Sequence, residues 1–226
     1  MASWMVHLRI ADELLSLINN ISPTEFVVGN VAPDSGIPND NWSSYTPDKK
    51  ASHFKTPGDD GHHYINADMF RSKYLREDQI LKYALKDYSF YLGYYVHLLT
   101  DVLWIKHALP LCKSRSSQEL LTSGGAIQSW KKDFYDLDAK FIRDNPKFRS
   151  FDIYRRAEGF KNEYLDIFAE NAFDDRRSYI VSFYLNERYD LDREYSYFTE
   201  NDMSSFIETA IKEIRVYIES AIVNKM

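Results

Sequence analysis

The segment from residue 91 to residue 107, YLGYYVHLLTDVLWIKH, constrains the fold more than any other part of the chain. It is apolar and aromatic over most of its length, which favours a buried central helix, yet it contains His97, Asp101 and His107. On a helix, His97 and Asp101 project from one face, about 40° apart around the axis. Gly93, one turn earlier, leaves that face thin where a metal, a substrate or another helix can approach. Because a buried carboxylate is costly unless it is paired, the pattern indicates either a hydrogen bond within the core or a metal site.

The composition is that of a folded protein with one sizeable core. The 226 residues fit a single domain covering residues 1–226, and 44% of them are hydrophobic. The net charge of −6 argues against general nucleic-acid binding, although a local cationic or metal site can still hold a phosphate. Cys112 is the only cysteine, which excludes internal disulfides and a thiolate zinc cluster. The N-terminus lacks the pattern of a secretion signal and no apolar run reaches membrane-spanning length, so we expect a soluble, cytoplasmic protein.

Helical periodicity dominates the chain and predicts an all-α fold. The predicted helices cover about residues 4–20, 65–76, 78–109, 126–144 and 201–224, and two more lie between 150 and 196. Asp78 is predicted to cap the helix over 78–109, and Pro110 to end it. The run FVVGNVA suits a helix or a strand, and Pro33 ends it in either case. We expect a multi-helix bundle around the long central helix.

Residues 34–64 are different in kind. They are rich in proline and glycine and show no sustained period, and a loop of this length within a compact domain is often functional. If the loop shapes a pocket, its aromatic and histidine side chains are candidate contacts: Trp42, Tyr45, Phe54, His62 and His63. For the two adjacent histidines, His62 and His63, we favour the alternative that they are ordinary loop residues.

The histidines and aspartates of the first half form a recognisable series. All six histidines lie within the first 107 residues, and histidine with aspartate, without cysteine, is the ligand set of catalytic zinc and related divalent sites. The segments WMVHLRIADELL, FVVGNVAPDS, SHF and YYVHLLTDVLW occur in the order H…APD…H…HxxxD. Over residues 4–107 this series resembles the zinc-dependent phospholipase C family. That family is all-helical and is similar in site architecture to single-strand-specific zinc nucleases.

The resemblance implies a role for each residue of the series. It assigns Asp34, His53, His97 and Asp101 to a first zinc, with Asp101 able to bridge to another, and it makes Asp34 the general base toward a metal-bound water. His7 matches a ligand of a further zinc, which secreted members complete with an N-terminal tryptophan. Trp4 is internal here and has no free amine unless the chain is trimmed. We therefore expect one or two zinc ions.

The second metal lacks some of the ligands that the family uses. His107 follows His97 at the spacing of a second-metal ligand, but the histidine and glutamate expected on the next helix are absent. Asp133, Asp136 and Asp138 are candidate replacements, or they form an acidic, solvated helix face.

Two hypotheses about function follow. The first is a metal-dependent hydrolase in which a metal-activated water cleaves a phosphoester: a phospholipid headgroup, a nucleotide or another small phosphodiester. The second, supported by the missing ligands, is a non-enzymatic helical protein with a structural or sensing zinc. An open position beside a cleft would favour the first hypothesis, and a closed shell of four ligands would favour the second.

Overall fold

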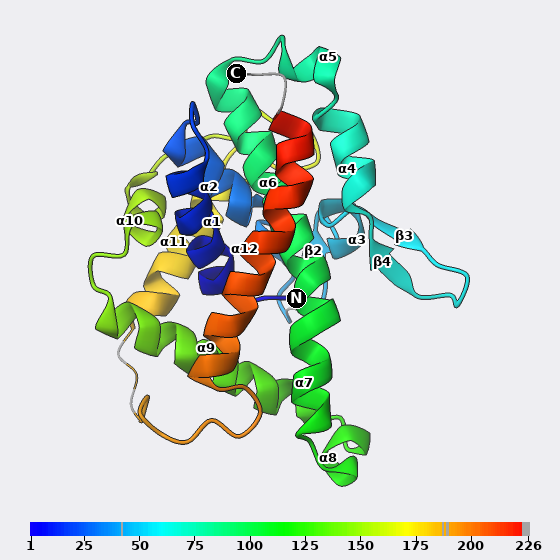
Figure 1. Ribbon diagram of the computed structural model, residues 1–226, viewed down its shortest axis with the longest axis vertical. Helices are drawn as coiled ribbons and strands as arrows, with labels where there is room; N and C mark the ends of the chain where they lie inside the picture. The colour runs from blue at the N-terminus through cyan, green and yellow to red at the C-terminus, as the bar shows by residue number, and fades with distance from the viewer. Residues whose placement is uncertain (42, 187, 189, 223–226) are drawn as a thin grey trace.

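The computed structural model describes residues 1–41, 43–186, 188 and 190–222. These residues form a bundle of helices, so the predicted all-α class is confirmed (Figure 1). The helices are α1 (Trp4–Leu17), α2 (Pro23–Val31), α3 (Lys49–Ser52), α4 (Ala67–Tyr74), α5 (Glu77–Ile80), α6 (Leu85–Leu103), α7 (Leu109–Ser114), α8 (Gln118–Thr122), α9 (Ala126–Asp144), α10 (Arg149–Arg156), α11 (Ala172–Leu185) and α12 (Glu200–Ile222). Within the described residues, no helix combines the length and hydropathy needed to cross a membrane.

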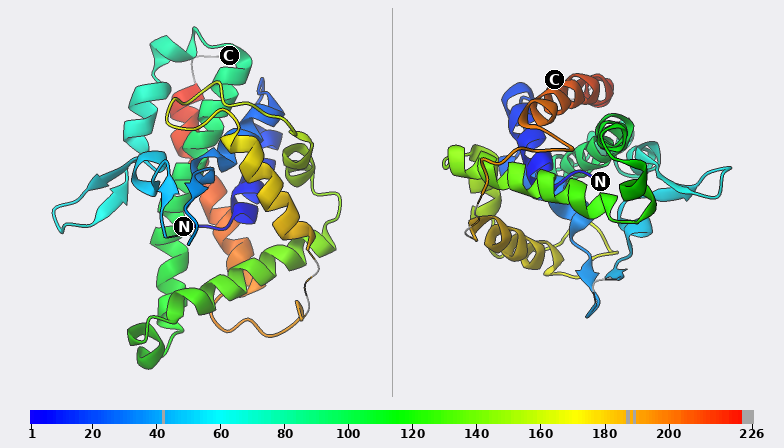
Figure 2. Two further views of the ribbon diagram at one scale, coloured as in Figure 1. Left: turned by 180° about the vertical axis from the view of Figure 1, so that it is seen from behind. Right: turned by 90° about the horizontal axis from the view of Figure 1, so that it is seen from below.

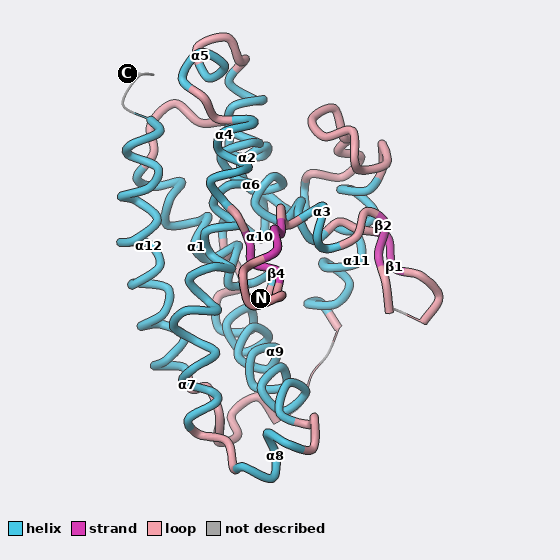
Figure 3. Tube along the Cα trace, turned by 90° about the vertical axis from the view of Figure 1, so that its right-hand side faces the viewer, coloured by secondary structure: helices cyan, strands magenta, loops and turns pink. Residues whose placement is uncertain are grey.

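The segment predicted as a loop contains two short antiparallel hairpins and a turn of helix. Strand β1 (Ile37–Pro38) pairs with β2 (Tyr45–Thr46), and β3 (Lys55–Pro57) pairs with β4 (His63–Ile65), with Thr56 opposite Tyr64. Figure 3 shows these strands as the short exceptions to a helical trace. The β3–β4 hairpin projects away from the helices, whereas α3 lies against them (Figure 1). The segment is therefore irregular but ordered into elements that place α3 beside the core.

Helix α6 is the centre of the bundle. It packs against α1, α2, α4 and α12, which surround it in the views of Figures 1 and 2. Nearly every side chain from Tyr88 to Leu103 is buried, as the apolar sequence predicts. The core is rich in aromatic rings, and Phe70 and Tyr94 stack with their ring centroids 4.6 Å apart.

Glycine allows α2 to lie unusually close to α6. A Cβ atom added at Gly93 would lie 2.1 Å from the carbonyl oxygen of Phe26, and one added at Gly29 would lie 2.2 Å from that of Phe90. No real side chain fits at such distances, so both helices need glycine at the crossing. The thin face predicted at Gly93 is therefore occupied by another helix. This contact settles FVVGNVA as helix, because α2 buries it against α6.

The predicted boundaries of the central helix are wrong at both ends. Asp78 lies in the first turn of α5 and forms an ion pair with Arg76, 3.0 Å away, so it does not cap α6, which begins at Leu85. Pro110 does not end the helical path. A π-helical turn, η2 (Trp104–Ala108), follows α6, and Pro110 then lies in the first turn of α7, where a missing N–H is tolerated.

The remaining boundaries agree more closely with the sequence pattern. Helix α9 covers the predicted residues 126–144, and α10 and α11 are the two helices expected between 150 and 196. Helix α1 ends three residues earlier than predicted, and α4 is shorter at both ends. The predicted end of the last helix, at Asn224, lies outside the described residues.

Candidate metal centre

Four elements bring five histidine and aspartate side chains together. His7 comes from α1, and His97 and Asp101 come from α6. Asp34 ends the 3-10 turn η1 (Ala32–Asp34) that continues α2, and His53 is the residue at the C-terminal end of α3. The close contact of α2 with α6 brings Asp34 to His97, and the ordered part of the loop brings His53 to both.

The first group consists of His53, His97, Asp34 and Asp101. The Nε2 atoms of His53 and His97 lie 3.4 Å apart, and Nε2 of His53 lies 3.5 Å from Oδ1 of Asp34. Oδ2 of Asp101 lies 3.7 Å from His53 and 3.6 Å from His97. Tetrahedral zinc with nitrogen and oxygen ligands at about 2.0–2.1 Å keeps its ligand atoms about 3.3 Å apart. These separations are therefore close to those of a zinc coordination shell.

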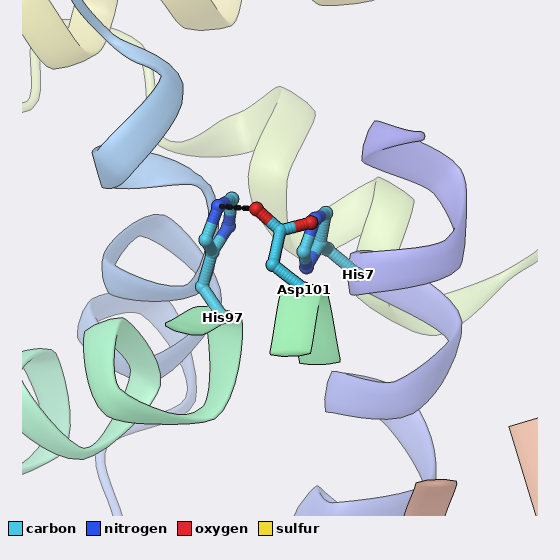
Figure 4. A group of neighbouring side chains, drawn as sticks. All are labelled: His7, His97 and Asp101. Carbon is cyan, nitrogen blue, oxygen red and sulfur yellow. Dashed lines mark ion pairs between the residues drawn. The ribbon is translucent and has the colours of Figure 1, made fainter. Parts of the chain in front are cut away.

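The second group consists of His7, His97 and Asp101, shown in Figure 4. The rings of His7 and His97 stack with centroids 3.8 Å apart, and Nε2 of His7 lies 3.6 Å from Oδ1 of Asp101. Because Oδ2 of Asp101 faces His53 and His97 while Oδ1 faces His7, the carboxylate lies between the two groups. The structure thus places Asp101 where the resemblance expects a bridging ligand.

The backbone at the N-terminus also reaches this centre, but not through Trp4. The amide of Ala2 donates a hydrogen bond of 2.8 Å to Oδ1 of Asp101. The indole of Trp4 packs among other rings, stacked on Tyr135 and edge-on to Phe183.

Several buried polar atoms of the centre have no hydrogen-bond partner among the described residues. They are Nδ1 and Nε2 of His7 and Oδ2 of Asp101. Leaving a buried polar atom unsatisfied costs about 1–3 kcal/mol, and more when the group is charged. A cation between these side chains would satisfy them, and nitrogen with carboxylate oxygen is a donor set that zinc accepts. The residues present therefore fit a zinc ion.

Neighbouring groups orient the imidazoles toward the centre. Nδ1 of His97 donates to the carbonyl oxygen of Asn30 at 2.8 Å, which leaves Nε2 as the nitrogen with a free lone pair. Nδ1 of His53 pairs with the hydroxyl of Ser52 at 2.9 Å, and Tyr94 donates a hydrogen bond to the carbonyl of Ser52. Such partners fix the tautomer and the ring orientation of metal-binding histidines.

The electrostatics of four of the five side chains favour the protonation states that bind metals. Burial, together with the neighbouring His97, lowers the pKa of His7 to about 4, and burial also lowers the pKa of His53. For Asp101, burial alone would raise the pKa, but the neighbouring imidazoles of His7 and His97 outweigh burial and hold it well below its usual value. The hydrogen bond to His53 has the same effect on the pKa of Asp34, which is lowered despite burial. For His97, burial alone would lower the pKa, but the neighbouring Asp101 outweighs burial and raises the pKa above its usual value, so this imidazole must lose its proton when a metal binds. The neutral imidazoles of His7 and His53 and the charged carboxylates are available at neutral pH.

His107 is not brought to this centre. Its Nε2 atom lies 2.8 Å from Oε1 of Glu213 on α12, and both side chains are about one third exposed. Its assignment to a second metal stays a prediction, with Glu213 as its observed partner in place of a second histidine.

The aspartates considered as replacement ligands on α9 have other partners. Oδ1 of Asp133 and Oδ2 of Asp136 each lie 2.8 Å from Arg193, and Asp138 accepts a hydrogen bond from Tyr184. They are buried, so they do not form the solvated acidic helix face considered as the alternative. The three carboxylates serve packing between α9 and later segments.

The loop residues proposed as pocket contacts fall in different places. Tyr45 lines a cavity beside the centre, whereas Phe54 packs edge-on against Phe70 in the core. His62 and His63 are exposed in the β3–β4 hairpin, so they are ordinary loop residues here. Trp42 lies outside the described residues.

A cavity of about 420 Å³ adjoins the metal centre at Asp34. Besides Asp34, its charged lining residues are Lys49, Lys131 and Arg176, which come from α3, α9 and α11. Sequence reasoning missed all three, because each belongs to a different segment and none stands in a local motif.

The fold and the site together define an all-helical protein with a buried histidine and aspartate centre suited to zinc. The sequence model of the family described as zinc dependent phospholipase C matches residues 6–215, which is most of the chain. The chain therefore belongs to the zinc-dependent phospholipase C family, and the match extends the resemblance beyond residues 4–107. The family supports zinc as the metal and implies a phospholipase C hydrolase. No curated protein and no solved structure matches the chain.

Proposed function

We propose that this protein hydrolyses phosphodiesters at a zinc centre held by His53, His97, Asp34 and Asp101, with His7 and the second oxygen of Asp101 available to a further ion. One observation carries the proposal: the side chain of Asp34 contacts the buried His53 and also lines the 420 Å³ cavity. A closed structural metal shell would have no such connection to a cavity.

The chain's own residues have distinct roles in this proposal. Zinc bound here would supply Lewis-acid stabilisation of negative charge on the phosphate and would lower the pKa of water toward neutrality. Asp34, charged at neutral pH, accepts the proton of the attacking water. His97 is held in its ligating tautomer by the carbonyl of Asn30, and His53 is oriented by Ser52. The cavity holds one of the two ester groups of the phosphodiester, either the group that leaves or the group that stays on the phosphate.

The test is hydrolysis of a chromogenic phosphodiester by the wild type and by Asp34→Asn, with and without added zinc, together with metal analysis. Asparagine keeps the size of the side chain but removes its charge. We expect turnover to fall by about 10²–10⁴-fold and metal content to fall with it, because general-base assistance alone contributes a factor of this size. Asp34 ends a turn at the surface of the core, so thermal stability without zinc should change little.

Asp40→Asn is the matched control, because Asp40 is an exposed aspartate of the same segment and does not line the cavity. Full turnover by Asp34→Asn would remove this residue from the mechanism. A wild type that binds stoichiometric zinc and yet cleaves no phosphoester would instead support the structural or sensing metal.

A further inference from the structure

The cavity beside Asp34 is lined by more cations than anions, although the chain as a whole is acidic. The chain carries a net charge of −6, but the cavity is lined by three cations, Lys49, Lys131 and Arg176, and by Asp34 as its one acidic residue. Because Asp34 contacts the metal-ligating His53, its charge is directed toward the metal centre. The other charged side chains that line the cavity are therefore all cationic.

Arg176 gives the clearest evidence that the cavity binds an anion. The residue is only 7% exposed, yet no carboxylate of the described residues forms an ion pair with its guanidinium. Its hydrogen bond goes to the carbonyl oxygen of Gly36, which uses a single one of the five guanidinium donors. Burying a cation without a counter-ion is costly, so an anion in the cavity would complete the environment of Arg176.

Two lysines add to the positive charge of the cavity lining. Lys49 is at the start of α3 and Lys131 is on α9, and neither belongs to an ion pair among the described residues. Lys132, the neighbour of Lys131, is by contrast paired with Asp136 at 2.6 Å. The lysine that lines the cavity is thus the one that α9 leaves without a carboxylate.

Aromatic residues also line the cavity, and aromatic faces can bind a quaternary ammonium group. Here the protein's own cations lie against three of the five aromatic side chains that line the cavity. The Nζ atom of Lys49 lies 4.8 Å from the ring centroid of Tyr45, and Cζ of Arg176 lies 5.5 Å from that of Tyr179. Arg188 similarly lies 4.4 Å from the ring centroid of Phe183. A ligand cation would meet like charge at these rings.

We propose that the cavity formed around Lys49, Lys131 and Arg176 selects phosphodiesters whose headgroup carries a second anionic group, a carboxylate or a phosphate, over those with a cationic headgroup. The inference rests on the proposed function for the position of the scissile phosphate. That phosphate carries one negative charge, which zinc at the Asp34 end would neutralise. Three further cations on the other walls match additional negative charge on the same molecule.

Binding of three soluble phosphates to the zinc-loaded protein tests the inference without relying on turnover. Phosphoglycolate, glycerol phosphate and phosphocholine share a phosphate and differ in a carboxylate, a hydroxyl or a trimethylammonium group. We expect calorimetry to show phosphoglycolate binding at least roughly tenfold more tightly than phosphocholine, with glycerol phosphate between them, because like charges in a binding site are strongly unfavourable.

Variants identify the residues responsible. Lys49→Gln and Lys131→Gln should each weaken phosphoglycolate binding several-fold and leave phosphocholine binding unchanged or improved. Lys50→Gln is the matched control for Lys49→Gln, because Lys50 is exposed on the same short helix but does not line the cavity. These exposed lysines can be changed without the risk of unfolding that attends the buried Arg176.

Turnover distinguishes a lipid from a soluble source of the same headgroup. Short-chain phosphatidylinositol 4-phosphate and soluble glycerophosphoinositol 4-phosphate, whose headgroups carry a second phosphate and no ammonium group, are each compared with their choline counterparts. Faster cleavage of the inositol phosphate compound in either pair supports the inference. Equal or tighter binding of phosphocholine, or no binding of any of the three phosphates, overturns it. Failure to cleave any phosphodiester while phosphoglycolate is still preferred would refute the proposed function and leave the anion site standing.

Discussion

The substitution Gly93→Ala tests whether the metal centre depends on the close crossing of α2 and α6. An added Cβ would lie 2.1 Å from the carbonyl oxygen of Phe26, whereas a carbon–oxygen contact settles at about 3.3 Å. The two helices must therefore separate by about 1 Å, or the backbone must distort by an equivalent amount. Neither atom is the end of a flexible side chain, so the contact cannot be relieved by a rotamer change.

The expected loss of stability follows from two opposing contributions. Overpacking in a core costs about 1–3 kcal/mol, and the clash with backbone favours the upper part of that range. Alanine offsets up to about 1 kcal/mol of this cost through its better helix propensity. We expect a net loss of about 1–2 kcal/mol, which lowers the Tm of a chain of this length by roughly 2–8 °C.

The same displacement should reach the proposed metal ligands. Asn30, which accepts the hydrogen bond from Nδ1 of His97, and Asp34 both follow Gly29 on α2 and η1. Loss of such an orienting contact typically lowers metal affinity by about 10–100-fold. Gly93→Ala should therefore bind zinc more weakly, as measured by competition with a chromogenic chelator.

The control is Gly125→Ala, where the added Cβ would lie 3.5 Å from Leu120, an ordinary contact, and where the backbone is compatible with alanine. Its Tm and zinc affinity should stay near those of the wild type. A Gly93→Ala protein as stable as the wild type and with equal zinc affinity would refute the reasoning, because the crossing would then tolerate a side chain.

Three further outcomes are expected. Zinc at about 100 times its dissociation constant should stabilise the fold by about 2.7 kcal/mol, seen as a rise in Tm of roughly 5–10 °C that a chelator reverses. His107→Ala should change the free energy of unfolding by less than about 1 kcal/mol and leave zinc content unchanged, because its pair with Glu213 is partly exposed and outside the centre. Burial raises the pKa of Asp138 to about 7, so the stability that its protonated form contributes is present at pH 4 and is lost as the pH rises toward 7. Asp138→Asn should remove this decline, by up to about 4 kcal/mol, in denaturant titrations at pH 4 and pH 8.

Each expectation has a result that contradicts it. An unchanged Tm with saturating zinc would mean that the five clustered side chains do not bind the ion. Loss of zinc in His107→Ala would place His107 at a second metal after all. Parallel pH profiles for the wild type and Asp138→Asn would show that Asp138 is charged in the folded protein at neutral pH.

The sequence alone determined the helical class and most of the helices, because apolar periodicity is a local property that each segment carries by itself. Helix α9 and the two helices after it follow from this pattern. The pairing of His97 with Asp101 is also local, since residues four apart on a helix must share a face. The series from His7 to Asp101 further indicated a zinc-dependent phospholipase C, and the family match confirms that resemblance.

Tertiary structure alone decided which side chains meet and what surrounds them. The boundaries of α6 depend on where Asp78 finds a partner and on how the π-helical turn accommodates Pro110, and neither is visible in a local pattern. The close contact at Gly93 depends on the position of α2. The partner of His107 is Glu213, more than a hundred residues away in the sequence. The cationic cavity draws Lys49, Lys131 and Arg176 from three distant segments. Such a site exists only through long-range packing. Electrostatic interactions and metal binding depend on the distance between groups in space, and the order of residues along the chain does not determine that distance.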